Sequence, residues 1–126
     1  IFPGVKVEEV RQQLQALAGP DVTVTAVEGS QTPETAPTPI RQDVLDAYKA
    51  AVATRFKDAP VVPYQSAGAT DGAFLRANGI PVYGFGGLWG IVGEREGAHG
   101  LDERVNAEGF HGQIPIWMDM LKRLAG

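Results

Sequence analysis

The chain has 126 residues, of which 44% are hydrophobic, and a formal net charge of −4 at pH 7. This length predicts one ordinary domain, and the acidic balance excludes the clustered Lys and Arg with which a protein binds nucleic acid. No run approaches the roughly 18 apolar residues of a membrane span, and the absence of cysteine excludes disulfides and thiolate metal sites. These features leave the compartment open between the cytoplasm and the periplasm or exterior.

The N-terminal part predicts a helix followed by a strand. Apolar residues recur at helical spacing over residues 7–17, and a Gly-Pro pair ends the pattern. Residues 22–27 alternate with period two and are rich in β-branched side chains, which is typical of a strand. One helix and one strand are too few for a domain, so we expect residues 1–28 to be the remnant of a separate unit. The start at Ile1, without Met or a leader pattern, favours a piece of a longer protein.

A proline-rich stretch follows and predicts the clearest boundary in the chain. Residues 29–40 hold Pro33, Pro37 and Pro39 among Ser, Thr, Gln and Glu, a composition typical of an extended linker. We therefore expect a second unit that spans residues 41–126.

The second unit predicts helices and strands in alternation. We expect helices at about 41–57, at 73–78 and in the C-terminal segment 110–124, with a kink or late start at Pro115. Strands are expected at 60–64 and 80–85. This order predicts an α/β fold, with a parallel sheet covered by helices.

Two loops fall at the expected carboxyl ends of these strands, where ligands bind in such sheets. The first is the small-residue turn 66–72, in which Thr70 or Asp71 is suited to cap the following helix. The second carries His99 between glycines, with Glu103 four residues later. Two interpretations of His99 stay open: a residue of a solvated charged loop, which is the commoner case, or a metal ligand whose ring Glu103 orients.

Several common motifs are missing. Residues 84–90 place Trp89 where a dinucleotide-binding G-x-G-x-x-G needs its third glycine, and no Walker lysine is present. Ser66 lacks the G-x-S-x-G elbow of a serine nucleophile, and His111 is interpreted as a surface residue of a helix. A zinc site needs three or four protein ligands, so the partners of His99, if it is a ligand, lie elsewhere.

Two stretches nevertheless have a familiar order: Ala69-Thr70-Asp71-Gly72 with Gly79-Ile80-Pro81 after it, and later Ala98-His99-Gly100-Leu101-Asp102-Glu103. They resemble the C-terminal part of the co-catalytic zinc amidohydrolases, the metallopeptidase family of aminoacylase, carboxypeptidase G, acetylornithine deacetylase and succinyl-diaminopimelate desuccinylase. The opening Ile1-Phe2-Pro3-Gly4 and the helix after it look like the end of the lid, or dimerisation, domain of that homodimeric family. The likeness covers nearly the whole chain.

The resemblance implies a fold and a site. The fold would be the C-terminal half of a zinc-peptidase-like α/β catalytic domain, with a parallel or mixed sheet, after a remnant of an α+β lid. His99 would bind one ion of a zinc pair, which cobalt can replace, and Glu103 would support its ring. The substrate pocket would be lined by Thr70, Asp71, Gly86 and Gly87. Ala73 departs from the family pattern, since some members have Arg there, which puts the subfamily and its substrate contacts in doubt.

The resemblance also implies an activity. The longer enzyme would hydrolyse an amide or peptide bond next to a free carboxylate, in an N-acylated amino acid or a peptide. Its general-base Glu and remaining metal ligands would lie upstream, so we expect no catalytic residue, no tightly bound zinc and no activity in this chain alone. Two alternatives stay open: a non-catalytic module that self-associates through exposed strand edges, and a stand-alone α/β domain that binds a small molecule.

Overall fold

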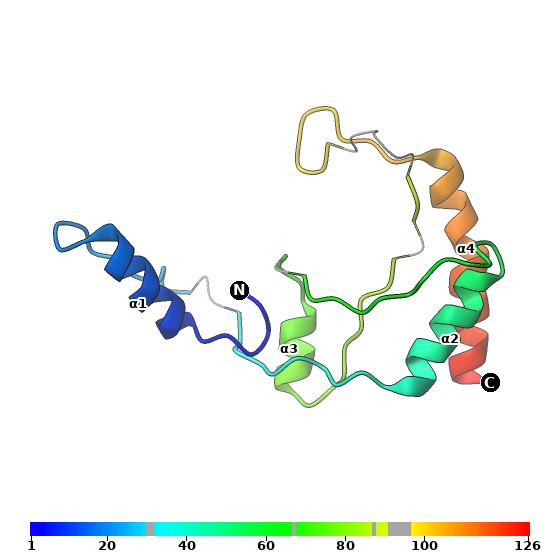
Figure 1. Ribbon diagram of the computed structural model, residues 1–126, viewed down its shortest axis with the longest axis horizontal. Helices are drawn as coiled ribbons and strands as arrows, with labels where there is room; N and C mark the ends of the chain where they lie inside the picture. Colours follow the sequence, from blue (N-terminus) through cyan, green and yellow to red (C-terminus); the bar gives the residue numbers. More distant parts are fainter. Residues whose placement is uncertain (30–31, 67, 87, 91–96) are drawn as a thin grey trace. The chain divides into compact units, whose positions relative to one another are not determined.

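The computed structural model describes residues 1–29, 32–66, 68–86, 88–90 and 97–126. Four helices lie in this part of the chain (Figure 1): α1 (Val7–Ala18), α2 (Gln42–Ala53), α3 (Gly72–Ala77) and α4 (Ala107–Ala125). They belong to two compact units, each built from two stretches of sequence. The first unit comprises residues 1–39 and 63–83, and the second comprises residues 40–62 and 84–126. The predicted division of the chain into domains, with boundaries after residues 28 and 40, remains a prediction.

The predicted α/β fold is wrong, because the structure is all-helical and its described residues contain no strand. The segments 22–27, 60–64 and 80–85, predicted as strands, have no regular secondary structure. A strand forms only when a neighbouring strand supplies the hydrogen bonds of a ladder. Periodic side chains show which face of a segment can be buried, and they do not supply that neighbour.

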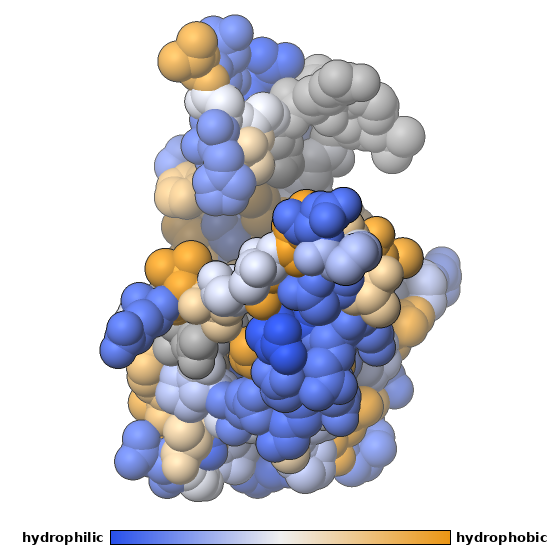
Figure 2. Space-filling view, turned by 90° about the vertical axis from the view of Figure 1, so that its left-hand side faces the viewer, coloured by the Kyte–Doolittle hydropathy of each residue, from blue (hydrophilic) through white to orange (hydrophobic). Residues whose placement is uncertain are grey.

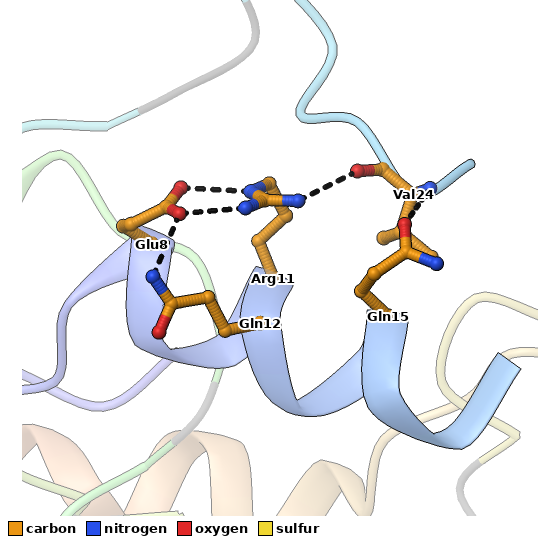
Figure 3. A network of polar contacts seen from close by, with 5 residues as sticks. All are labelled: Glu8, Arg11, Gln12, Gln15 and Val24. Carbon is orange, nitrogen blue, oxygen red and sulfur yellow. Dashed lines mark hydrogen bonds and ion pairs between the residues drawn. The ribbon is translucent and has the colours of Figure 1, made fainter. Parts of the chain in front are cut away.

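Side chains bond the backbone of the first unit where a neighbouring strand was expected. The Gln15 side chain donates to the Val22 carbonyl at 2.7 Å and accepts from the Val24 amide at 2.9 Å. Arg11 donates to the Val24 carbonyl at 3.3 Å, so two residues of α1 hold this segment (Figure 3). The amide of Val82 similarly donates to the Thr38 hydroxyl at 3.2 Å.

An ion pair on the surface of α1 orients Arg11. Its Nε and Nη2 donate to the two carboxylate oxygens of Glu8 at 2.8 and 2.7 Å, and Gln12 donates to the same carboxylate at 3.0 Å (Figure 3). The hydrogen bond from Arg11, followed by that from Gln12, lowers the pKa of Glu8 to about 2. The carboxylate is therefore ionised over the whole neutral range.

The proline-rich segment makes specific contacts within the first unit. The Glu34 carboxylate accepts from the Val7 amide at 2.9 Å and pairs with Lys6 at 3.0 Å, so it closes the N-terminus of α1. The Thr35 carbonyl accepts from the Gly4 amide at 2.7 Å, and its hydroxyl accepts from Arg76 of α3 at 3.0 Å. This segment thus contacts both helices of its unit.

In the second unit, α2 and α4 lie side by side (Figure 1). Their facing surfaces bury Ala47 and Ala51 of α2 against Ile116 and Met120 of α4. Partly buried side chains surround this core: Tyr48, Val52, Phe85, Trp89 and Trp117. The core of the second unit therefore consists of small residues and two larger aliphatic ones.

Helix α4 begins earlier than its proline suggested. Asn106 caps it, since the side-chain oxygen accepts from the Gly109 amide at 2.7 Å. The helix continues through Pro115, which removes one backbone donor without ending the helix. In the described part of the chain, no helix is both long and apolar enough to cross a membrane.

The chain exposes more surface than its size predicts. Its accessible surface is 9703 Å². Two compact units of these sizes, without any contact between them, would expose about 7,800 Å² by the usual scaling of surface with mass. Figure 2 shows one face, on which apolar side chains lie open among polar ones. Several large apolar side chains among the described residues are exposed, such as Leu17, Val62 and Leu101.

Candidate functional site

The His99 loop contains a tight turn that begins at Gly97. The Gly97 carbonyl accepts from the Gly100 amide at 2.8 Å, which makes His99 the third residue of a four-residue turn. His99 has φ of 64°, a left-handed conformation that residues other than glycine rarely adopt. The neighbouring Gly97 has the same φ and lies against the backbone of Asp102, since an added Cβ would be 3.2 Å from its carbonyl oxygen. The turn presents an exposed histidine.

Glu103 folds back toward this turn. Its carboxylate oxygen is 3.4 Å from the backbone amide of His99, a long hydrogen bond. The contact is with the backbone, whereas the sequence predicted a partner of the imidazole ring. The carboxylate lies close to the histidine, and its role beside the ring remains a prediction.

A zinc site at His99 would need further ligands besides its imidazole. A protein zinc site takes three or four ligands from His, Cys, Asp and Glu. No group of three such residues lies together within the described ranges, from which residues 30–31, 67, 87 and 91–96 are left out. His99 is the single donor that the predicted site takes from this chain, so any zinc held there needs ligands from other residues.

Thr70 and Asp71 lie at the beginning of α3 in the first unit. The Thr70 hydroxyl accepts from the Gly72 amide at 3.3 Å, while Asp71 occupies the N-cap position without a capping hydrogen bond from its side chain. Gly72 lies close to Val82, because an added Cβ would be 2.8 Å from a methyl group of that valine. Thr70 therefore has a local structural role beside its predicted substrate role.

Helix α3 ends in a Schellman motif. The Ile80 amide donates to the Leu75 carbonyl at 3.0 Å, and the Gly79 amide donates to the Arg76 carbonyl at 2.9 Å. Gly79 has φ of 77°, which the motif requires. The Gly-Ile-Pro sequence thus sets the exit of this helix.

Gly86 belongs to a glycine-rich segment of the second unit, and Gly87 lies outside the described residues. The Tyr48 hydroxyl of α2 donates to the Gly86 carbonyl. Gly86, His99 and Glu103 lie in the second unit, whereas Thr70 and Asp71 lie in the first. The substrate pocket predicted from Thr70, Asp71, Gly86 and Gly87 therefore stays a prediction.

Sequence reasoning missed the contacts that hold this glycine-rich segment. Trp89 lies against α4 at two glycines, where a Cβ on Gly109 would overlap its carbonyl oxygen and a Cβ on Gly112 its ring. The Arg55 guanidinium lies 4.2 Å from the centroid of that ring and pairs with Glu108 at 2.8 Å. The spacing of Gly109 and Gly112 was a sequence signal for this contact, because two glycines three residues apart lie on one face of a helix and let another segment approach it closely.

The comparisons with known proteins add no relative. No family model, no curated protein and no solved structure matches the chain.

Proposed function

We propose that this chain is the C-terminal part of a two-zinc hydrolase that cleaves an amide or peptide bond next to a free carboxylate. The support comes from the resemblance of residues 69–86 and 98–105 to that family. In this proposal His99 binds one metal ion, and Thr70, Asp71, Gly86 and Gly87 line the substrate pocket. The other metal ligands and the general-base glutamate come from residues upstream, so the isolated chain is inactive.

Beside the resemblance, the conformation of His99 is the structural observation that supports the proposal. A left-handed conformation costs roughly 1–2 kcal/mol for a residue with a side chain. His99 holds φ of 64° in an exposed turn, where glycine would be free of that cost. Strained residues of this kind concentrate at functional sites. A metal-binding imidazole gives a reason for keeping histidine at a position that favours glycine.

The substrate would be an N-acylated amino acid or a peptide with a free carboxylate. The chemistry that a zinc pair supplies in such enzymes is polarisation of the scissile carbonyl and activation of a water molecule. The part of this chain is to hold one imidazole and to line the pocket. Loss of a side chain that supports a metal ligand typically costs about 10–100-fold in metal affinity or activity, which is the effect expected of Glu103→Gln.

The test compares the two histidines of the chain in the longer natural protein. His99→Ala should abolish zinc-dependent hydrolysis of N-acetylated amino acids, because it removes a metal ligand. His111→Ala is the matched control, since it removes the other histidine, which lies exposed on α4. Equal hydrolysis by the wild type and His99→Ala would refute the proposed role, and loss of activity in both variants would point to a general loss of structure.

A second function, self-association, is favoured by the exposed apolar surface. Phe110, Ile114, Met118 and Leu121 recur along one face of α4 and are each about half exposed, at 49–53%. The opposite face packs on α2 through Ile116 and Met120. An uncovered apolar helix face of this length is typical of an interaction surface.

Sedimentation tests this second function directly. The chain should associate at tens of micromolar, a concentration range in which exposed apolar surface brings chains together. Leu121→Glu should weaken the association, whereas Leu101→Glu, at a fully exposed loop residue outside α4, should leave it unchanged. A monomer at every concentration would exclude self-association of this chain.

A further inference from the structure

The segment 84–90 contains glycines at positions 84, 86 and 90 among its described residues. Glycine populates more backbone conformations than any other residue, so a segment of this composition does not hold one shape by itself. If its backbone lines a substrate pocket, the free energy of ordering it reduces affinity unless another part of the fold has already ordered it. The structure supplies such contacts from α2 and α4.

Tyr48 of α2 makes the first contact. Its hydroxyl donates to the Gly86 carbonyl, and its ring lies 4.8 Å from the ring of Phe85 at an interplanar angle of 41°. The Phe85 ring in turn meets Trp117 of α4 edge-on, with centroids 6.2 Å apart. Partial burial raises the pKa of Tyr48, so its hydroxyl stays protonated and can donate throughout the neutral range.

Trp89 makes the second contact, three residues beyond Gly86. It lies on the surface left open by Gly109 and Gly112 of α4, with the Arg55 guanidinium 4.2 Å from its ring centroid. The second contact fixes Trp89 on α4. Tyr48 therefore acts on a segment that is already anchored nearby, and its hydroxyl sets the orientation of the Gly86 carbonyl.

We infer that Tyr48 is a positioning residue, which orders the backbone of Gly86 for the carboxylate-bearing substrate before that substrate binds. The inference rests on the proposed function, in which Gly86 lines the substrate pocket. Tyr48 lies on α2 and acts through Gly86 without touching the reacting atoms. Because it orders a binding surface that the bound substrate and the transition state share, its loss should raise KM and leave kcat nearly unchanged.

The first measurement uses the chain of 126 residues. In Tyr48→Phe the carbonyl carbon resonance of Gly86 should move upfield, as expected when a carbonyl loses a hydrogen-bond donor. Tyr83→Phe is the matched control, because its hydroxyl also donates to a backbone carbonyl, that of Pro39, at 2.8 Å. The Gly86 resonance should be unchanged in the control. An unchanged resonance in Tyr48→Phe, with the helical content of the wild type, would overturn the inference.

The second measurement uses the longer zinc-loaded protein with N-acetylated amino acids. One hydrogen bond contributes about 0.5–1.5 kcal/mol net, so Tyr48→Phe should raise KM about 2- to 12-fold with kcat within a factor of two. A fall in kcat with KM unchanged would overturn the positioning role. If the wild-type protein hydrolyses none of these substrates, the proposed function fails and the substrate role of Tyr48 fails with it, while the Gly86 resonance still reports whether Tyr48 orders the segment.

Discussion

The contact between Trp89 and α4 makes a prediction about the sign of a stability change. Gly112→Ala adds one methyl group to the interior of α4, where alanine is favoured over glycine by about 1 kcal/mol. Helix propensity alone therefore predicts a more stable protein. The structure predicts the opposite, because the new Cβ would overlap the Trp89 ring and lie 2.5 Å and 3.1 Å from two further ring atoms.

The magnitude follows from the packing of the ring. Carbon atoms pack comfortably at about 3.5–4.0 Å, so the ring or the helix must move, and overpacking of this kind costs about 1–3 kcal/mol. If the ring leaves, it loses the Phe56 ring, 5.2 Å away at 79°, and the stacked Arg55. After the helix-propensity gain is subtracted, we expect a net loss of about 1 kcal/mol, or a Tm about 4–8 °C lower.

Urea unfolding followed by far-UV circular dichroism measures this change in two backgrounds. In Trp89→Ala the space over Gly112 is empty, so the same Gly112→Ala substitution should raise stability by about 1 kcal/mol. The double-mutant cycle should therefore give a coupling free energy of about 2 kcal/mol. If Gly112→Ala stabilises the protein equally with and without Trp89, the ring does not pack on this glycine and the account of the segment is incorrect.

Three further predictions concern the two units. Met120→Ala should lower the free energy of unfolding by about 2–5 kcal/mol, because Met120 is only 3% exposed between α2 and α4; an unchanged urea midpoint would contradict that packing. Gly79→Ala should cost about 1–2 kcal/mol, because φ of 77° strains alanine, and an equally stable variant would show that α3 does not end in this conformation. The helicity of α1 should fall with acid. The pKa of Glu8 is lowered from 4.5 to about 2, so the stability that the ionised Glu8 contributes to α1 is complete above pH 4.5 and is lost as pH falls through about 2. Glu8→Gln should remove that part of the acid transition in circular dichroism, and an identical transition in the variant would count against the pair with Arg11.

Helices were the predictable part of this fold. Apolar spacing placed α1 and α2 within a few residues of their observed bounds, because one apolar stripe is enough to recognise an amphipathic helix. The extended segments were misread, because a strand also needs a neighbour that one segment cannot specify. The Val24 amide donates instead to the side chain of Gln15, nine residues earlier in the chain. A polar contact of this kind does not show in hydrophobic periodicity.

The sequence indicated candidate residues for a site, whose role stays a prediction, and it did not indicate their local geometry. Two flanking glycines marked the His99 turn, yet nothing in the spacing indicated that His99 itself would have φ of 64°. The hydrogen bond from the Tyr48 hydroxyl to the Gly86 carbonyl joins residues that are 38 positions apart. Tyr48 lies in the helix that was predicted at about 41–57, but a hydroxyl that bonds a distant carbonyl has no local sequence pattern.

The zinc content of the longer protein that we propose reports directly on the role of His99. With His99 as a ligand, metal analysis of protein dialysed against metal-free buffer should find two zinc ions per chain in the wild type and one in His99→Ala. His111→Ala should retain both ions. Two zinc ions in His99→Ala, or none in the wild-type protein, would contradict the assignment of His99 as a ligand.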